Sequence, residues 1–182
     1  DGIESLVQCH GIGGLRPNTV LAGWPNDVTR VEAFGANLRL VARLGRISIA
    51  VRFLEYREDE ASDTEAHDDP WSIPKGTIDV WWRGKKNGGL LLLLAHLLHQ
   101  NPEWRRNEIR ILRVVPVEEA KGEVERHMLE LCAAARISAE QVVLVSNDPP
   151  RAIHKTSATA AIVILGLDAP EEGAEVEFFE RM

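Results

Sequence analysis

The chain has 182 residues, of which 45% are apolar and 27% charged, ordinary values for a soluble globular protein of one domain or two small ones. Its formal net charge of −7 disfavours a non-specific nucleic-acid binder, because phosphate neutralisation requires clustered Lys and Arg. The two cysteines, Cys9 and Cys132, form no C-x-x-C pair, which argues against a zinc site or a disulfide framework and fits a reducing compartment.

The first third of the chain predicts a strand–helix–strand unit. A strand is expected over Val20–Trp24, and Asp27 is the expected N-cap of the helix that follows. Gly45 stands where a helix-terminating glycine belongs, and a strand over residues 47–54 comes next. Apolar residues recur in the helix at three- and four-residue spacing: Val31, Phe34, Leu38 and Val41. The unit predicts a right-handed parallel crossover.

Residues 55–75 carry eight acidic residues and two prolines without a sustained apolar period. This composition predicts a long, exposed acidic loop, extending to about residue 76. The stretch DTEAHDD within it lacks the glycine and the spacing of a calcium-binding EF-hand loop.

From residue 77 onward the pattern predicts alternating strands and helices, typical of an α/β layered fold with a mostly parallel sheet. Residues 147–155, NDPPRAIHK, are expected to form a breaker-rich loop. Phe178 and Phe179 are candidate anchors for the end of the chain. The expected elements are strands at Thr77–Trp82, Glu108–Val115, Gln141–Ser146 and 160–167, and helices at Gly89–His99 and Glu118–Arg136.

The apolar run Leu90–Leu98 covers nine residues, with His96 among them. Crossing a bilayer requires about 20 apolar residues, so the run is too short to insert into a membrane. A helix that is apolar on all sides is normally buried within a protein, and this is the expected position of the run.

Two glycine-rich stretches raise the question of phosphate binding. Gly11–Gly14 precede a strand rather than a helix, the wrong order for a dinucleotide loop. The loop after residue 82 has the right order, and its candidate anion- or nucleotide-binding residues are Lys85, Lys86, Asn87, Gly88 and Gly89. Because no Walker sequence is present, a tight turn that lets the helix approach the sheet is the alternative.

Other polar residues predict no catalytic or metal site. His96 and His99 can share a helix face, but two ligands alone do not make a metal site. His127 stands between Glu123 and Glu130 and is expected to be a solvated helix residue. Asp79 is the odd polar residue of an apolar strand, and the sequence does not decide between a loop end and a partner.

Four blocks of this sequence resemble successive blocks of one family. They are DGIESLVQCHGIGGLRPNTVLAGW, KGTIDVWWRGKKNGGLLLLLAHLL, NEIRILRV and TSATAAIVILGL. They occur in the family's order and together span nearly the whole chain. The chain thereby resembles the carboxy-terminal cytosolic domain of cation–chloride cotransporters, which include the sodium–potassium–chloride and potassium–chloride transporters.

The resemblance implies a Rossmann-like three-layer α/β sandwich, similar to universal stress proteins. It implies a regulatory domain without enzymatic activity or cofactor, which forms a homodimer. The domain would be attached, on the cytoplasmic face of the membrane, to the transmembrane domain of the same transporter. The ion pathway would lie in that membrane part, so the resemblance assigns no ion-coordinating residue to this chain.

Departures from the family pattern refine these expectations. Family members usually carry acidic residues just before the Gly–Gly pair, where this chain has Lys85, Lys86 and Asn87, which favours an anion site. The acidic segment is short compared with animal members and lacks a long Ser/Thr-rich stretch, so we do not expect phosphorylation control of the animal type. The family member that this chain resembles is expected to be a prokaryotic one. We expect residues 1–182 to form a single domain, the latter part of a larger one.

Three other hypotheses stay open at this point. One is a nucleotide-binding sensor of the universal-stress type, and another is the tail of an amino-acid-permease-like carrier. The third, a small hydrolase-like enzyme, lacks a visible nucleophile–base pair.

Overall fold

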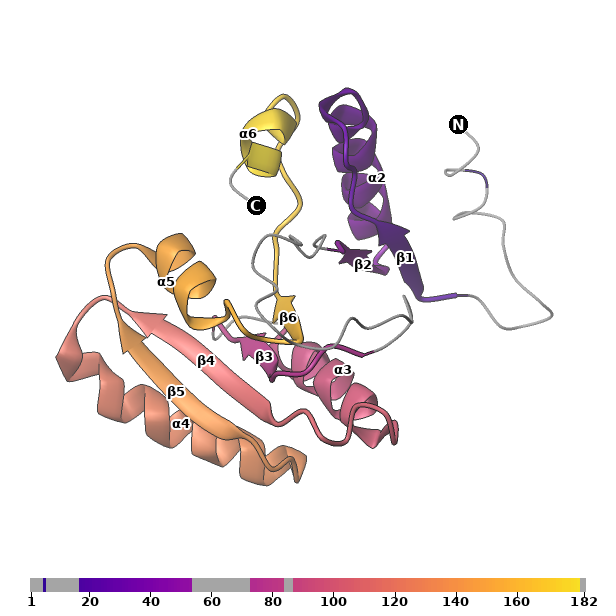
Figure 1. Ribbon diagram of the computed structural model, residues 1–182. Helices are drawn as coiled ribbons and strands as arrows, with labels where there is room; N and C mark the ends of the chain where they lie inside the picture. Colours follow the sequence, from indigo (N-terminus) through magenta and orange to yellow (C-terminus); the bar gives the residue numbers. More distant parts are fainter. Residues whose placement is uncertain (1–4, 6–16, 54–72, 84–86, 181–182) are drawn as a thin grey trace, which may run out of the picture. The chain divides into compact units, whose positions relative to one another are not determined.

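The computed structural model describes residues 5, 17–53, 73–83 and 87–180 (Figure 1). The glycines at 11–14, most of the expected acidic loop, Lys85 and Lys86 lie outside these residues. The chain divides into two compact units: unit 1 comprises residues 1–64 and 168–182, and unit 2 comprises residues 65–167. The expectation of one domain over residues 1–182 stays a prediction, because two compact units can belong to one domain.

Unit 2 is built around a four-stranded, fully parallel sheet with the strand order β5-β4-β3-β6. The chain runs from β3 outward to β5 and then crosses back to place β6 on the other side of β3. This is a doubly wound arrangement. Its strands are β3 (Ile78–Trp81), β4 (Ile109–Val115), β5 (Glu140–Val145) and β6 (Ile162–Leu165).

Three layers make up unit 2, because helices cover both faces of its sheet. Helices α3 (Gly88–Gln100) and α4 (Lys121–Ala135) lie on one face, and α5 (Pro149–Thr156) lies on the other (Figure 1). The short 3-10 turn η3 (Glu118–Ala120) leads into α4. The expected Rossmann-like α/β sandwich is thereby confirmed.

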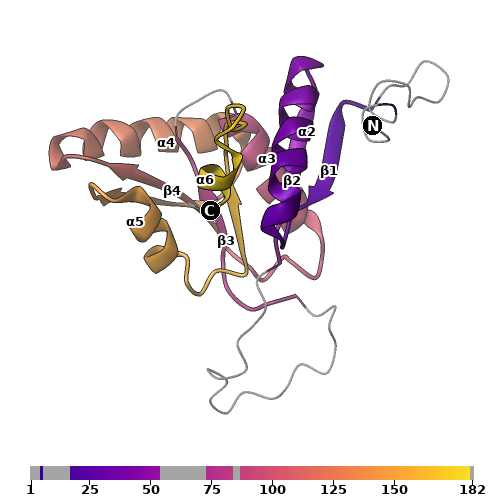
Figure 2. The same ribbon diagram turned by 90° about the horizontal axis from the view of Figure 1, so that it is seen from above.

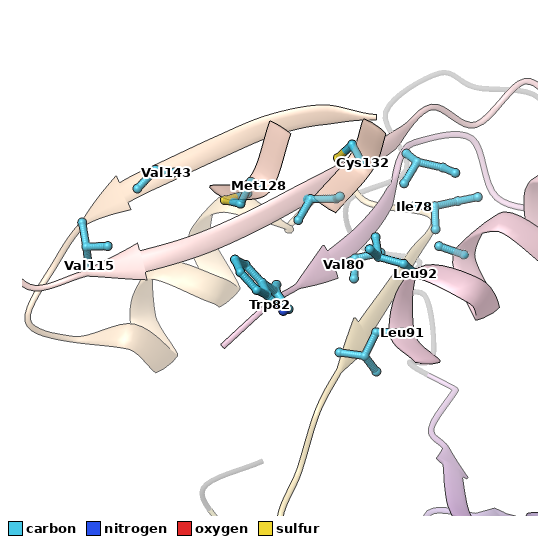
Figure 3. Close-up of a cluster of buried hydrophobic side chains, with 12 residues drawn as sticks. Ile78, Val80, Trp82, Leu91, Leu92, Val115, Met128, Cys132 and Val143 are labelled. Carbon is cyan, nitrogen blue, oxygen red and sulfur yellow. The ribbon is translucent and has the colours of Figure 1, made fainter. Parts of the chain in front are cut away.

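The apolar core of unit 2 lies between the sheet and the pair α3 and α4 (Figure 3). Because strand side chains alternate between faces, Ile78 and Val80 of β3 and Ile109, Ile111 and Val115 of β4 contribute to it. The core side chains include Ile78, Val80, Trp82, Leu91, Leu92, Ile111, Met128, Cys132 and Val143. Cys132 is a free, buried thiol.

Two expectations about unit 2 were wrong. Residues 149–156 form helix α5 rather than a loop, because Asp148 caps the helix through its bond from the Arg151 N–H, and proline is tolerated in a first helical turn. Helix α3 is not buried on all sides, because it covers a single face of the sheet. Leu91 and Leu92 face the core, whereas Leu93 and Leu97 are 50% and 57% exposed.

The described part of the chain contains no helix that is both long enough and apolar enough to cross a membrane.

Unit 1 contains the predicted strand–helix–strand element. Strands β1 (Thr19–Gly23) and β2 (Ile47–Val51) pair in parallel, connected through the 3-10 turn η1 (Val28–Arg30) and helix α2 (Val31–Arg43). The Asp27 carboxylate accepts a 2.8 Å hydrogen bond from the Thr29 N–H and so caps the 3-10 turn η1, whereas Arg30 is the N-cap residue of α2 itself. Gly45 follows α2 with a φ of 66°, so the predicted C-terminal boundary of the helix is confirmed.

The C-terminal segment belongs to unit 1, although it follows β6 of unit 2. Its helix α6 (Glu175–Glu180) lies beside α2, as Figures 1 and 2 both show. The Trp24 ring contacts those of Phe178 and Phe179 at centroid distances of 6.0 and 5.9 Å. The predicted anchoring role of these two phenylalanines is confirmed.

The two glycines that open α3 provide a matched test of its packing. A Cβ on Gly88 would collide with the Trp82 indole, whereas a Cβ on Gly89 would enter open space. We expect Gly88→Ala to lower the free energy of unfolding by about 1–3 kcal/mol through overpacking. We expect Gly89→Ala to be neutral or to stabilise by up to about 1 kcal/mol, since alanine favours helix. Urea unfolding of the two variants measures the difference, and equal stabilities would contradict the described contact.

Candidate functional site

The carboxyl ends of the strands in unit 2 form the edge where doubly wound proteins usually bind ligands. Strand β3 lies between β4 and β6, and the connections that leave β3 and enter β6 run in opposite directions across the sheet. The switch point therefore lies between β3 and β6. Strand β3 ends at this point, and Gly88 and Gly89 open the helix that follows it.

The predicted anion-binding residues are only partly within the described chain. Asn87 occupies the N-cap position of α3 without a side-chain capping bond, and Gly88 and Gly89 form the first helical turn. Gly88 is buried and Gly89 is exposed. The structure thus brings three of the five candidates together at a helix N-terminus, and an anion site there stays a prediction.

Trp82 occupies the space immediately beside this helix start. Its indole lies against Gly88 and is 6% exposed. The His127 ring stacks on it at a centroid distance of 5.2 Å and an interplanar angle of 11°, and the Arg113 guanidinium lies 5.2 Å from the ring centroid. A cation beside an aromatic face is attracted by its quadrupole. Packing therefore accounts for the small residue at position 88, and His127 is a stacking residue.

A buried polar cluster lies on the opposite face of the sheet, beside α5. Asp79 and Trp81 alternate with the core residues of β3 and so project to this face. Asp79 is fully buried, and Ser157, directly after α5, is 9% exposed. Arg110 stands opposite Asp79 in the parallel pairing of β3 and β4. We call Asp79, Arg110, Ser157, Trp81 and Thr77 the Asp79 cluster.

Every member of the Asp79 cluster is hydrogen-bonded. Arg110 binds the carboxylate bidentately, with Nε 2.8 Å from Oδ1 and Nη2 2.6 Å from Oδ2. The Ser157 hydroxyl donates to Oδ2 and the Thr77 hydroxyl to Oδ1, both at 2.6 Å. The Trp81 indole N–H donates to the Ser157 oxygen at 2.9 Å. Charge-assisted, bidentate contacts of this kind are the strong ones among protein hydrogen bonds.

These contacts keep Asp79 ionised. Burial by itself raises the pKa of Asp79, but the hydrogen bonds from Arg110, Ser157 and Thr77 outweigh it, so that the pKa lies below its ordinary value of 3.8. The same bonds to Asp79 raise the pKa of Arg110. The cluster is therefore a carboxylate–guanidinium ion pair at physiological pH.

The geometry of the cluster indicates a structural role rather than a catalytic one. Its carboxylate accepts four hydrogen bonds and has no exposed surface for a substrate. The Ser157 hydroxyl donates its proton to this carboxylate, and no histidine of the described residues is bonded to the cluster, so none of them is placed as the general base that would activate this serine as a nucleophile. The cluster fastens the end of α5 to the two central strands.

Among residues 17–53, 73–83 and 87–180, no group of three or more His, Cys, Asp or Glu side chains is placed to hold a metal ion. His96 instead lies 3.2 Å from the Gln100 amide nitrogen on the same helix.

Sequence reasoning identified Asp79 but missed Arg110 and Ser157. A usable signal was present, because the strand sequences IDV and IRI each place a charged residue second. If the two parallel strands pair at their first residues, Asp79 and Arg110 become direct neighbours on adjacent strands. Ser157 carries no comparable signal, since its approach to Asp79 depends on where α5 ends.

The sequence of the chain matches a known protein family over most of unit 2. Residues 70–173 match the family model described as solute carrier family 12. The chain belongs to this family. The matched residues of this solute carrier family 12 chain cover almost all of unit 2, including every strand of its sheet and the whole Asp79 cluster.

A relative in solute carrier family 12 extends the comparison. The chain is 34% identical over 127 residues to potassium/chloride cotransporter 3 of Caenorhabditis elegans. This alignment covers 66% of the chain and 10% of the relative, so the chain spans about a tenth of that cotransporter's length. The resemblance to cation–chloride cotransporters is confirmed.

Removing the charge of Asp79 tests the cluster. We expect Asp79→Asn to lower the free energy of unfolding by about 3 kcal/mol, because Arg110 then keeps a partly buried charge without a counter-ion. The control is Glu118→Gln, which breaks an exposed 3.8 Å pair with Lys121 and should cost less than about 0.5 kcal/mol. Chemical unfolding at neutral pH gives both values, and similar losses would contradict the role of the cluster.

The same variant carries a pH test. Since the folded pKa of Asp79 is lowered, its stabilisation is complete above the ordinary value of 3.8 and is lost as the pH falls through the folded value. The stability difference between the unsubstituted chain and Asp79→Asn should stay constant down to about pH 5 and shrink at lower pH. A difference that grows on acidification would argue against a paired carboxylate.

Proposed function

We propose that the chain is a cytosolic regulatory and dimerisation domain of a membrane cation–chloride cotransporter, whose transmembrane part performs the ion symport. The family match over residues 70–173 carries this proposal, because it coincides with a compact α/β unit rather than with a membrane span. The name of the nematode relative, a potassium/chloride cotransporter, supports chloride as one transported ion.

The chemistry of unit 2 supports a non-enzymatic role. Its most strongly bonded polar group, the Asp79 carboxylate, is fully buried and is held entirely by the protein. Its apolar core occupies the face beside α3 and α4. A sheet held in one register by these bonds suits a domain that acts by contacting the transmembrane part of the carrier. The expected prokaryotic origin stays a prediction, since the relative is an animal protein.

Ion flux through the intact carrier tests the regulatory role. We expect the reading frame to encode about a dozen membrane spans besides this chain. Chloride-dependent rubidium uptake, divided by the amount of carrier at the membrane, should fall in Asp79→Asn and stay unchanged in Glu118→Gln. A carrier that transports normally after removal of residues 65–167 would sink the regulatory proposal. Light scattering over a dilution series of the purified chain tests the homodimer, and a monomer at every concentration would sink the dimerisation role.

A nucleotide-binding sensor is the second candidate function. It is favoured by the position of Asn87, Gly88 and Gly89 at the switch point of a doubly wound sheet. The Trp82 indole against Gly88 opposes it by filling adjacent space.

Calorimetric titration with ATP, ADP and AMP separates the two functions. The carrier-domain proposal predicts no binding, or weak binding that is abolished by Lys85→Glu combined with Lys86→Glu. Lys155→Glu, an exposed position on α5, is the control for a general loss of positive charge. Tight binding that requires the adenine base would favour the sensor.

A further inference from the structure

The C-terminal segment 168–180 packs on α2 and Trp24 of unit 1 through a small set of specific contacts. Its helix α6 has six residues, too short to be stable without a partner. Its helix α6 packs against α2, and Phe178 and Phe179 contact Trp24, so these contacts lie in unit 1, although the segment is joined covalently to β6 of unit 2. We call residues 168–180 the clasp, and Trp24, Phe34, Gly35 and Arg39 the α2 site.

One end of the α2 site recognises charge. Arg39 Nη1 lies 2.6 Å from Oε1 of Glu175, whose side chain is 6% exposed, and also donates to the Pro170 carbonyl at 3.2 Å. The pKa of Glu175 is lowered, first by a bond from its own backbone N–H and then by Arg39. The clasp therefore presents a carboxylate and a carbonyl oxygen to a single guanidinium, which suits the several donors of arginine.

The other parts of the site recognise shape. Trp24 stacks on Phe179 at an interplanar angle of 12° and meets Phe34 edge-on at 5.3 Å. Gly35 leaves room for the clasp, because a Cβ at this position would lie 2.5 Å from Glu175 Cγ and 3.2 Å from Pro170 Cγ. Aromatic anchors, one ion pair and a close backbone approach together resemble the binding of a short helix in a groove.

We propose that the α2 site also accepts the clasp of a second copy of this chain, so that two copies exchange their C-terminal segments. The occupant follows from the complementarity already present, since an identical clasp would make identical contacts with the other copy. The connecting residues 167–169 and 171–173 are exposed, and Gly173 has a φ of 86°. Exchange of an identical element is a low-cost route to a dimer.

The concentration of the protein determines whether the clasp occupies the α2 site of its own chain or that of a second copy. A clasp on its own chain is favoured by its high effective concentration, so exchange grows as copies are brought together. The inference rests on the proposed homodimer of a membrane carrier, in which two copies are held close. It deepens that proposal by naming the segment exchanged and the surface that receives it.

Cysteine pairs test the exchange directly in the full chain. A Cβ at position 35 would lie 3.5 Å from Glu175 Cβ, within the range that a disulfide requires. Gly35→Cys and Glu175→Cys are placed on separate chains, both carrying Cys9→Ser, while the buried Cys132 is kept. After mixing and oxidation, we expect a reducible covalent dimer that increases with concentration.

The control pair replaces Gly35→Cys by Gly122→Cys, where a side chain enters open space. The test pair should give at least about tenfold more covalent dimer than the control pair. Yields equal to the control overturn the inference. So does a chain carrying both Gly35→Cys and Glu175→Cys that forms its internal disulfide while the mixed chains form none.

A charge exchange gives an independent readout that needs no oxidation. Arg39→Glu and Glu175→Lys each place like charges at the clasp of their own chain, whereas a mixture restores opposite charges at both exchanged contacts. Light scattering should therefore show more dimer in the mixture than in either variant alone. No gain on mixing overturns the exchange, whereas a dimer of the unsubstituted chain formed without covalent exchange leaves the proposed homodimer standing.

Discussion

The bidentate pair between Asp79 and Arg110 is the contact on which unit 2 depends. It joins the two central strands of a parallel sheet at a fully buried position, where an unpaired charge would be costly. Ser157 extends it to the chain after α5, and that chain leads directly into β6. One carboxylate thus links the outward path of the chain, through β4, to its return through β6.

The two faces of the sheet contribute differently to the fold: the apolar face supplies most of the stability, and the face with the Asp79 cluster fixes the strand register. Apolar burial beside α3 and α4 supplies the larger driving force, but apolar side chains tolerate rearrangement when their total volume is kept. The Asp79 cluster is directional, since its donors match only one register of β3 against β4.

Unit 1 uses different chemistry to hold a distant part of the chain. Within the described residues of unit 1, β1 and β2 form a two-stranded parallel sheet, and isolated two-stranded sheets are marginal in water. Helix α6 adds aromatic contacts to Trp24 and an ion pair to Arg39. The C-terminal segment is therefore part of the packing of unit 1.

The sequence by itself determined most strands and helices other than α5, the parallel α/β class, the end of α2 before Gly45, and the shortness of the leucine run relative to a membrane span. These follow from local periodicity, capping and length. Tertiary structure alone decided the order β5-β4-β3-β6, the exposure of Leu93 and Leu97, and the partners of Asp79. Two of those partners, Arg110 and Ser157, lie 31 and 78 residues away, and no local pattern encodes which chain crossing brings them to Asp79.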